Sequence, residues 1–311
     1  MSYELSVSEV GPAEYPLMEV LRETIFSEAG HVSLAPLADD LEGRQDVFAL
    51  IAHLEGNPIG FKIGYRFGPG VYYSKSSGVL KDYRRNGLGR RMQEWQHGWL
   101  RARGYRKVFF NSFNQFKDMI RFGLETGFIL TGAERQQTGD LSFKVAKNLV
   151  LPDPPRRPRL PTGDVRVQLV GREAWGLIAA MASLGGDTVH EEQIETEASG
   201  PNAIALIVHL DSKPVGFALG RSGLDATYIT KRFGVVDTYR DRGAEAALAG
   251  AVLEEARLTD HTLVRWNAAH DDIESIITAL RASYDLTGLQ HHCPTRHTSV
   301  VLEHPIAASP I

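Results

Sequence analysis

The chain has 311 residues, of which 43% are hydrophobic and 23% charged, a composition that suits globular domains with buried cores. Its net charge of −4 excludes an overall basic surface, so nucleic acid is not expected as a partner. A single cysteine, Cys293, excludes an internal disulfide and fits a reducing compartment. The sequence shows neither a basic leader nor an apolar run of membrane-spanning length, so we expect a cytoplasmic protein with no membrane partner.

The elements of the first half can be predicted from hydrophobic periodicity and from turn residues. In chain order they are a strand over 4–10, a helix over 13–27, strands over 47–52 and 59–66 joined by a turn at 56–57, a strand over 71–81, a helix over 88–103, a strand over 107–112, a helix over 116–125 and a strand over 141–146. Antiparallel hairpins come first and strand–helix crossovers follow. This order predicts a mixed α/β sheet rather than a doubly wound nucleotide-binding fold.

The segment 84–92 (Arg-Arg-Asn-Gly-Leu-Gly-Arg-Arg-Met) joins the strand at 71–81 to the following helix. A tight glycine turn at a helix N-terminus gathers backbone N–H groups and the positive end of the helix dipole, which suits a phosphate or pyrophosphate. Gly87 and Gly89 keep side chains away from that backbone. Arginines of this kind also occur in ordinary surface turns, so the segment alone leaves both interpretations open.

The second half of the chain repeats the first. The segment 53–61 recurs at 209–217, and the same shift of 156 positions matches Tyr72 to Tyr228 and Gly87 to Gly243. The register holds without a gap from residue 53 to residue 132. Two copies of one domain explain this, and the chain length suits two domains of roughly 150 residues.

A proline-rich segment separates the copies. Prolines exclude a helix or central strand at 151–161, so we expect an extended tether over 152–163. The N-terminal domain is accordingly predicted at 1–151 and the C-terminal domain at 164–311. Near the start of each copy the shift is 160 (Val10 to Val170), so the first copy carries four additional residues between about 12 and 52.

The order of elements, with Arg-x-x-Gly-x-Gly at 84–89 after the fourth strand, resembles the GNAT superfamily of acyl-CoA-dependent N-acyltransferases. Asn114 and the helix end at 124–128 (Leu-Glu-Thr-Gly-Phe) are also similar to its pattern. The resemblance covers nearly all of 3–147 and, more faintly, 164–303. It implies two tandem GNAT-like α/β (α+β) domains. Each would have a mixed, mostly antiparallel sheet that splays between its fourth and fifth strands and is flanked by helices.

The resemblance also implies acetyl-CoA as the cosubstrate. Its pyrophosphate would lie on the backbone of the turn, its pantetheine arm would add along the fourth strand, and Asn114 would hold that arm from the far side. The residues implied for the cofactor are Val79, Leu80, Arg84, Arg85, Asn86, Gly87, Leu88, Gly89, Arg90 and Asn114. Backbone N–H groups of Gly78 and Val79 would stabilise the tetrahedral oxyanion.

Two catalytic groups that are common in that superfamily are missing. The strand at 71–77 offers no carboxylate as general base, and Gly123 stands where a tyrosine general acid would be expected. Tyr72 and Tyr73 are the candidates on the strand, with sheet packing as the alternative interpretation. Three residues of the first helical region are further candidates that could reach the acceptor: Glu23, Glu28 and His31. The alternative interpretation is that they are ordinary solvated surface residues. Positioning and oxyanion stabilisation alone also support acyl transfer, at lower rate.

The second copy differs at the phosphate turn. Glu245 replaces the last glycine, and His270 stands in the place of Asn114. A carboxylate there would repel a pyrophosphate and block the backbone. We therefore expect the C-terminal copy to have lost acyl-CoA binding and to serve as a packing partner or as a wall of the acceptor pocket.

A metal site is not expected. Histidines and a cysteine cluster near the C-terminus (His291, His292, Cys293 and His297). Adjacent residues of a strand point to opposite faces, and no Cys-x-x-Cys spacing supports a site.

The resemblance thus implies an N-acetyltransferase that moves an acetyl group from acetyl-CoA to the amine of a small molecule by direct attack, with a peptide or protein N-terminus as the alternative acceptor. The N-terminal domain would be active and the C-terminal domain degenerate, and a homo-oligomer is compatible with this organisation. The competing class is a non-catalytic acyl-CoA-binding sensor or interaction protein, which the missing general base and acid would fit.

Overall fold

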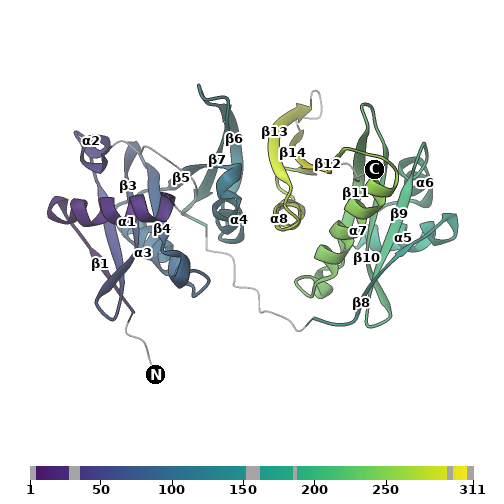
Figure 1. Ribbon diagram of the computed structural model, residues 1–311, viewed down its shortest axis with the longest axis horizontal. Coiled ribbons are helices and arrows are strands. Elements are labelled where there is room, and N and C mark those ends of the chain that lie inside the picture. Colours follow the sequence, from purple (N-terminus) through teal and green to yellow (C-terminus); the bar gives the residue numbers. More distant parts are fainter. Residues whose placement is uncertain (1–4, 28–35, 152–161, 185–187, 293–296, 307–311) are drawn as a thin grey trace. The chain divides into compact units, whose positions relative to one another are not determined.

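The computed structural model describes residues 5–27, 36–151, 162–184, 188–292 and 297–306. The chain divides into two compact units, Met1–Pro154 and Pro155–Ile311, and each is described by itself (Figure 1). Within the described ranges no helix is both long and apolar enough to cross a membrane. Three residues named above, Glu28, His31 and Cys293, lie outside the described residues, as does most of the expected tether, 152–161.

The N-terminal unit is built on one seven-stranded sheet with the order β1-β2-β3-β4-β5-β7-β6. Neighbouring strands are antiparallel except β4 and β5, which are parallel. Its elements are β1 (Leu5–Glu9), α1 (Tyr15–Ser27), α2 (Leu37–Leu41), β2 (Phe48–Leu54), β3 (Asn57–Gly68), β4 (Val71–Val79), α3 (Leu88–Ala102), β5 (Lys107–Phe113), α4 (Lys117–Glu125), β6 (Ile129–Arg135) and β7 (Leu141–Asn148).

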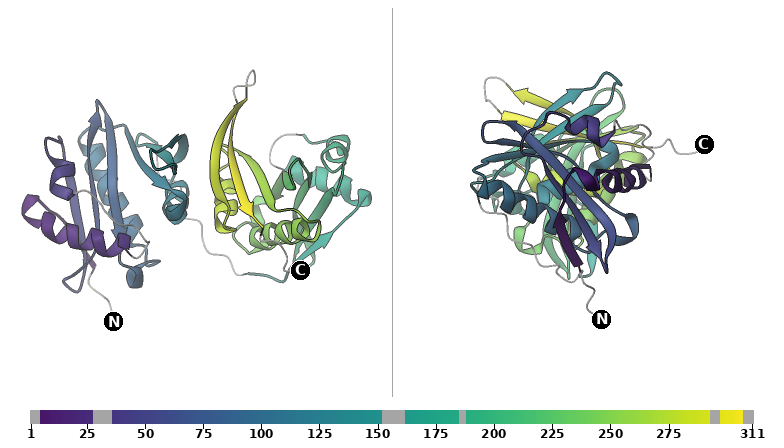
Figure 2. Two further views of the ribbon diagram at one scale, coloured as in Figure 1. Left: turned by 45° about the horizontal axis from the view of Figure 1, so that its top comes forward. Right: turned by 90° about the vertical axis from the view of Figure 1, so that its left-hand side faces the viewer.

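Helices cover both faces of this sheet, as the views in Figure 2 also show. The apolar stripe of α1, which includes Met18, Leu21 and Ile25, packs with Phe61 and Ile63 of β3 in one core. Tyr72 of β4 points the opposite way and meets Trp99 of α3, with the ring centroids 5.9 Å apart. The two faces are therefore an α1 face and an α3 face, and successive residues of each strand alternate between them.

The parallel strands diverge, as the predicted fold class requires. β4 and β5 pair only where Val71–Tyr73 faces Lys107–Phe109. Beyond this point β4 stays paired with β3, and β5 stays paired with β7. The expected splay between the fourth and fifth strands is confirmed, and it opens toward the carboxyl ends of both strands.

A β-bulge lies on β4 beside this divergence. Two residues of β4, Ser74 and Lys75, stand opposite the single residue Gly64 of β3. A Cβ atom on Gly64 would lie 2.6 Å from the Tyr72 ring and 2.5 Å from the Tyr73 carbonyl oxygen, so only glycine allows this close approach.

The C-terminal unit repeats this architecture. Its seven-stranded sheet has the order β13-β14-β12-β11-β10-β9-β8, which is the order of the first sheet read from the other edge. Its parallel pair, β11 and β12, also pairs only at the start, over Thr227–Thr230 and Leu263–Trp266. The elements are β8 (Val165–Leu169), α5 (Trp175–Ser183), α6 (Glu191–Glu197), β9 (Ile204–Leu210), β10 (Lys213–Ser222), β11 (Thr227–Val235), α7 (Ala244–Leu258), β12 (Leu263–Ala269), α8 (Ile273–Arg281), β13 (Asp285–His292) and β14 (His297–Pro305).

Two elements of the first unit were not predicted. β6 is an edge strand whose residues are mostly exposed, so it carries no clear hydrophobic alternation. The five-residue helix α2 is too short for a helical period to be recognised. All the strands and helices that the sequence did predict are present.

Candidate functional site

The segment between β4 and α3 is an exposed turn that leads directly into the helix. Gly87, the N-cap of α3, has a φ of 77°, and Arg85 has a φ of 67°, both in the left-handed region. Within the described chain no side chain caps this helix. The N–H groups of its first turn have no acceptor inside the helix and point outward, so they are available to an anion.

Arginines surround these N–H groups. The Nε of Arg84 donates to the carbonyl oxygen of Val79 at 2.8 Å, which fastens the turn to the end of β4. No carboxylate among the described residues pairs with Arg85, Arg90 or Arg91. Their positive charge is therefore available beside the helix N-terminus. Asn86 and Leu88 complete the turn, the first exposed and the second buried as its anchor.

The free edge of β4 lines the gap between the diverging strands. The N–H of Leu80 donates to Ile59 of β3 at 2.9 Å, so by the alternation of an antiparallel ladder Gly78 also directs its N–H toward β3. Val79 and Ser77 then direct their N–H groups toward the gap. Of the two predicted oxyanion donors, only Val79 is on the gap side. The Leu80 N–H, implied for pantetheine, is already used within the sheet.

Asn114 lies across the gap from Val79. It begins the single helical turn Asn114–Phe116 that follows β5. Since β4 and β5 are parallel, their carboxyl ends meet at one end of the sheet, where the arginine turn also begins. The structure thus brings the turn, the free edge of β4 and Asn114 to the margins of one gap, which is where ligands bind in open α/β sheets.

Tyr72 has a structural role and not the predicted catalytic one. Its side chain is fully buried on the α3 face, and burial raises the pKa of its hydroxyl far above the usual value. The hydroxyl accepts the N–H of Phe48 at 3.0 Å and donates to the carbonyl oxygen of Asp46 at 3.2 Å. A hydroxyl with both bonding directions used inside the core cannot reach a substrate.

Replacing Tyr72 by phenylalanine should therefore lower stability without changing turnover. The buried N–H of Phe48 would lose its acceptor, which costs about 1–3 kcal/mol of unfolding free energy. Urea unfolding of Tyr72→Phe would measure the loss. Tyr228→Phe is the matched control in the second unit, because no described residue hydrogen-bonds to that hydroxyl. Lost turnover with unchanged stability would restore Tyr72 as a catalytic candidate.

Tyr73 is placed differently, at the base of the gap. It belongs to the last residue pair that joins β4 to β5, and its ring stacks on Phe109 with centroids 4.9 Å apart. Burial, together with nearby Tyr65 and Asp40, raises the pKa of Tyr73 to about 12. Its hydroxyl is therefore protonated at neutral pH and is a hydrogen-bond donor.

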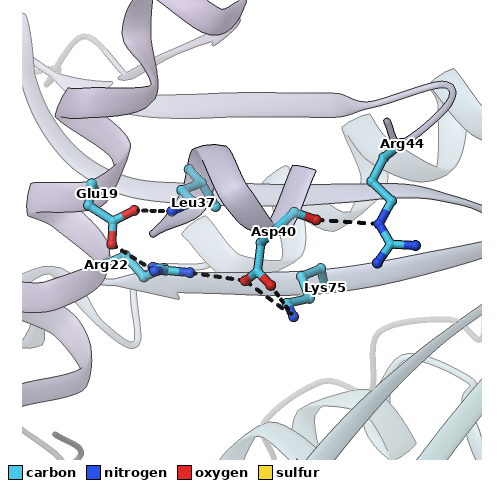
Figure 3. A network of polar contacts seen from close by, with 6 residues as sticks. All are labelled: Glu19, Arg22, Leu37, Asp40, Arg44 and Lys75. Atoms are coloured by element: carbon cyan, nitrogen blue, oxygen red, sulfur yellow. Dashed lines mark hydrogen bonds and ion pairs between the residues drawn. The ribbon is translucent and has the colours of Figure 1, made fainter. Parts of the chain in front are cut away.

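The sequence analysis missed a carboxylate that reaches β4 from α2. Asp40 lies 3.3 Å from the ammonium of Lys75 on the bulge, and Figure 3 shows the network around this pair. Arg22 of α1, only 2% exposed, lies between Asp40 at 3.6 Å and Glu19 at 2.7 Å. Asp40 thus supplies the negative charge that the strand itself lacks, from an element about 35 residues earlier. Glu23, the other acidic candidate, is exposed on α1.

The absence of a tyrosine at Gly123 also has a structural cause. A Cβ atom on this residue of α4 would lie 2.7 Å from the ring of Phe110. The helix packs too closely on β5 for any side chain at that position.

The corresponding turn of the second unit is filled by its own carboxylate. Gly243 has a φ of 95° and Asp241 a φ of 59°, which matches Gly87 and Arg85. Glu245, at the position of Gly89, accepts the backbone N–H of Asp241 at 3.0 Å. An internal anion therefore occupies a donor that a phosphate would need.

The geometry defines an α/β domain with an exposed, arginine-flanked turn at the mouth of a diverging parallel strand pair. The sequence model of the acetyltransferase (GNAT) family matches residues 15–128. That stretch holds the diverging strands, the turn and Asn114, so the match places a GNAT acetyltransferase domain in the N-terminal unit. Members of the family use acyl-CoA, and acyl transfer is the activity that the match supports.

Solved structures with a similar fold are also acetyltransferases by name. The ribosomal-protein-S18-alanine N-acetyltransferase of Escherichia coli is 12% identical with a TM-score of 0.42, covering 47% of this chain and 96% of its own. Ard1 of Thermoplasma volcanium is 14% identical with a TM-score of 0.41, covering 46% and 98%. A putative acetyltransferase of Salmonella typhimurium, solved with acetyl-CoA, is 10% identical with a TM-score of 0.38, covering 47% and 96%. A search of curated proteins finds no match.

Proposed function

We propose that this chain is an N-acetyltransferase that transfers an acetyl group from acetyl-CoA to a small-molecule amine in its N-terminal unit. The uncapped, arginine-rich turn at the mouth of the β4–β5 gap is the observation that carries the proposal. The turn supplies backbone donors and charge for a pyrophosphate, and the gap supplies a free strand edge for an extended amide-containing arm.

In this proposal each chain segment has a distinct role. The N–H groups from Arg85 to Arg90 bind the pyrophosphate, with Arg84 holding the turn against β4. The N–H of Ser77 pairs with a pantetheine amide beside Val79, and Asn114 holds the arm from the β5 side. The N–H of Val79 polarises the thioester carbonyl, which stabilises the oxyanion that forms when the amine attacks.

Tyr73 is the proposed hydrogen-bond donor near the leaving group. Its raised pKa keeps the proton on the hydroxyl at neutral pH, so it can stabilise a developing thiolate by donation. Tyr72 has no part in the reaction because its hydroxyl is bonded within the core.

The C-terminal unit is proposed to bind no acyl-CoA. Glu245 accepts the N–H of Asp241, and Arg281 pairs with the Asp241 side chain at 2.9 Å. The charges of this turn are satisfied internally, so a pyrophosphate would have to displace a bonded carboxylate.

A second candidate function is a non-catalytic acyl-CoA-binding sensor. The observation that favours it is the lack of a carboxylate on β4 together with the tight packing at Gly123, which excludes the usual acid. Both candidates bind acetyl-CoA and differ only in turnover.

One titration and one assay test these proposals. Calorimetric titration of acetyl-CoA into the whole chain should give one site per chain. Amine-dependent release of free thiol should then be seen with a panel of small amines. Binding without thiol release from any amine would favour the sensor, two sites would reject the degenerate C-terminal unit, and no binding would reject acyl transfer.

A further inference from the structure

Four aromatic residues form a connected surface at the base of the gap in the N-terminal unit, here called the aromatic shelf. Tyr73 stacks on Phe109 with their planes 21° apart, and it meets Tyr65 edge-on at 5.5 Å. Phe67 meets Phe109 edge-on at 4.9 Å and is 63% exposed. The shelf therefore runs from the interior of the unit, beside the point where β4 and β5 separate, out to solvent.

The shelf lies on the α1 face, where Tyr65 and Tyr73 pack at the edge of the core that α1 and α2 cover. α1 packs on β3 and β4, whereas α4 packs on β5, β6 and β7. Gly123 of α4 meets Phe110, and Phe110 points to the face opposite its neighbour Phe109. In the described parts of the unit, α4 thus lies on the other side of the sheet from the shelf. Tyr65 and Phe109 are buried, at 7% and 5% exposed, Tyr73 is half-buried, and Phe67 is the ring that reaches solvent.

The second copy has lost the whole shelf. The equivalent positions hold Arg221, Gly223, Ile229 and Arg265 in place of Tyr65, Phe67, Tyr73 and Phe109. The registers agree, because Arg221 pairs with Ile229 and Ile229 pairs with Arg265, as Tyr65 pairs with Tyr73 and Tyr73 with Phe109.

On the opposite face the tyrosine of the core is kept, as Tyr72 in one unit and Tyr228 in the other, and both are fully buried. The rings that pack on Tyr72 are not kept, since Glu255 and His261 stand at the positions of Trp99 and Tyr105. The shelf itself is found in the copy whose phosphate turn is unobstructed.

Charges around the shelf are mostly positive. The guanidinium of Arg44 lies 4.6 Å above the Tyr65 ring, and the ammonium of Lys144 lies 5.0 Å from the Phe109 ring. Lys75 stands at the margin near the gap and is paired with Asp40 (Figure 3). Three cations and one carboxylate thus border an aromatic floor, which is complementary to a ring that carries one negative and one positive group.

We propose that the aromatic shelf binds the acceptor, and that the acceptor is an amine that carries both an aromatic ring and a carboxylate. This inference rests on the proposed function and names its substrate class. The ring stacks on Phe67 and Tyr73, the carboxylate pairs with Arg44 and Lys144, and the amine lies toward Asp40 and the gap. The nitrogen forms the amide bond as the C–S bond breaks; its proton passes through Asp40 to solvent, and the thiolate takes up a proton from solvent.

Three amines that differ in the ring or in the carboxylate test this substrate class. L-phenylalanine has the ring and the carboxylate, phenethylamine lacks the carboxylate, and L-norleucine lacks the ring. We expect L-phenylalanine to bind the chain, and to be acetylated, at least about tenfold better than either of the others. Calorimetric binding without acetyl-CoA is measured alongside thiol release, so that the shelf is tested even if no transfer occurs. Equal or better use of phenethylamine or L-norleucine, or no binding of L-phenylalanine, would overturn the proposal.

Variants of single residues test whether L-phenylalanine binds at the aromatic shelf. Phe67→Gly, which installs the residue of the second copy, should weaken L-phenylalanine binding about tenfold and leave acetyl-CoA affinity unchanged, while Phe67→Tyr should restore it. Trp95→Ala removes another exposed aromatic, from α3, and should change neither affinity. If L-phenylalanine binds but acetyl-CoA does not, the shelf stands and the proposed function fails. If acetyl-CoA binds and a different amine class is acetylated, the function stands and the shelf assignment fails.

Discussion

Replacing Gly89 by glutamate is expected to weaken acetyl-CoA binding by about 100-fold or more, which corresponds to roughly 3 kcal/mol. The variant copies the second unit, where Glu245 at this position accepts the N–H of Asp241 at 3.0 Å. Arg85 has the same left-handed backbone as Asp241, so the new carboxylate can accept its N–H in the same way. It would then compete with the pyrophosphate for the donors and repel its charge. Calorimetric titration of the variant would measure the loss.

The design separates lost binding from lost folding. Glutamate in the first turn of a helix is favourable by about 0.3–1 kcal/mol because it faces the positive end of the dipole, so Gly89→Glu should unfold no earlier than the wild type. Gly89→Ala is the size control. A Cβ atom there would meet Phe122 at an ordinary 3.7 Å, and this variant should keep most of the affinity. Unchanged affinity in Gly89→Glu would reject the turn as the pyrophosphate site.

The turn could be predicted because it depends on local sequence: Gly87 must adopt a positive φ, and glycine does so without strain. The divergence of the fourth and fifth strands has no local signal, and it was expected from the resemblance to a known fold. The repeat predicted that the second half has the same architecture, and the two sheets do have the same strand order.

The roles of neighbouring residues could not be predicted, because they depend on which way each group points. Tyr72 and Tyr73 are adjacent and both tyrosine, yet one is bonded in the core and the other lies in the gap. The backbone N–H groups alternate in the same way, so that of Gly78 is directed toward β3 and that of Val79 toward the gap. The bulge at Lys75 shifts this parity partway along β4, and no residue pattern marks it.

Asp40 was missed for a different reason. The partners of its carboxylate, Arg22 of α1 and Lys75 of β4, are far from it in sequence. In the second unit Glu197 of α6 and Arg232 of β11 form a comparable link, through two hydrogen bonds of 2.7 Å each. That link is bidentate and short, whereas Asp40 and Lys75 lie 3.3 Å apart; both pairs are partly exposed to a similar degree.

The two copies thus differ at the residues of the phosphate turn and of the aromatic shelf. The second copy has a glutamate in the turn, and two arginines, a glycine and an isoleucine on the strands where the first has aromatic residues. The sheet order and the bulge are retained. The frame of the sheet is thus common to both copies, whereas the residues that we propose to face the ligands differ.

A buried lysine of the first unit leads to the second large effect. Lys62 of β3 is 4% exposed, and burial lowers its pKa from 10.5 to about 8. The position equivalent to Lys62 in the second copy is Ala218, so the fold itself does not require an amine there. The lysine lies on the face that α3 covers, where the buried Gln96 of that helix has no described hydrogen-bond partner.

Lys62→Met should therefore stabilise the N-terminal unit at neutral pH by up to about 3 kcal/mol, the free-energy equivalent of this pKa shift. Below pH 8 both folded and unfolded chains hold the proton, and the folded state carries the cost of a buried charge. Between pH 8 and 10.5 the unfolded state binds more protons, so wild-type stability rises with pH and the advantage of methionine fades. Methionine fills the same unbranched volume without a charge.

Urea unfolding of both proteins at pH 7 and at pH 10.5 measures this difference, with the exposed Lys107→Met as the matched control that should change little at either pH. A gain that is equal at both pH values would assign the effect to packing and not to the charge. A loss of stability at pH 7 would show that the ammonium of Lys62 is held by favourable contacts when the chain is folded. If Lys62→Met is more stable and still transfers acetyl groups at the wild-type rate, Lys62 lowers the free energy of unfolding of the N-terminal unit and takes no part in its reaction.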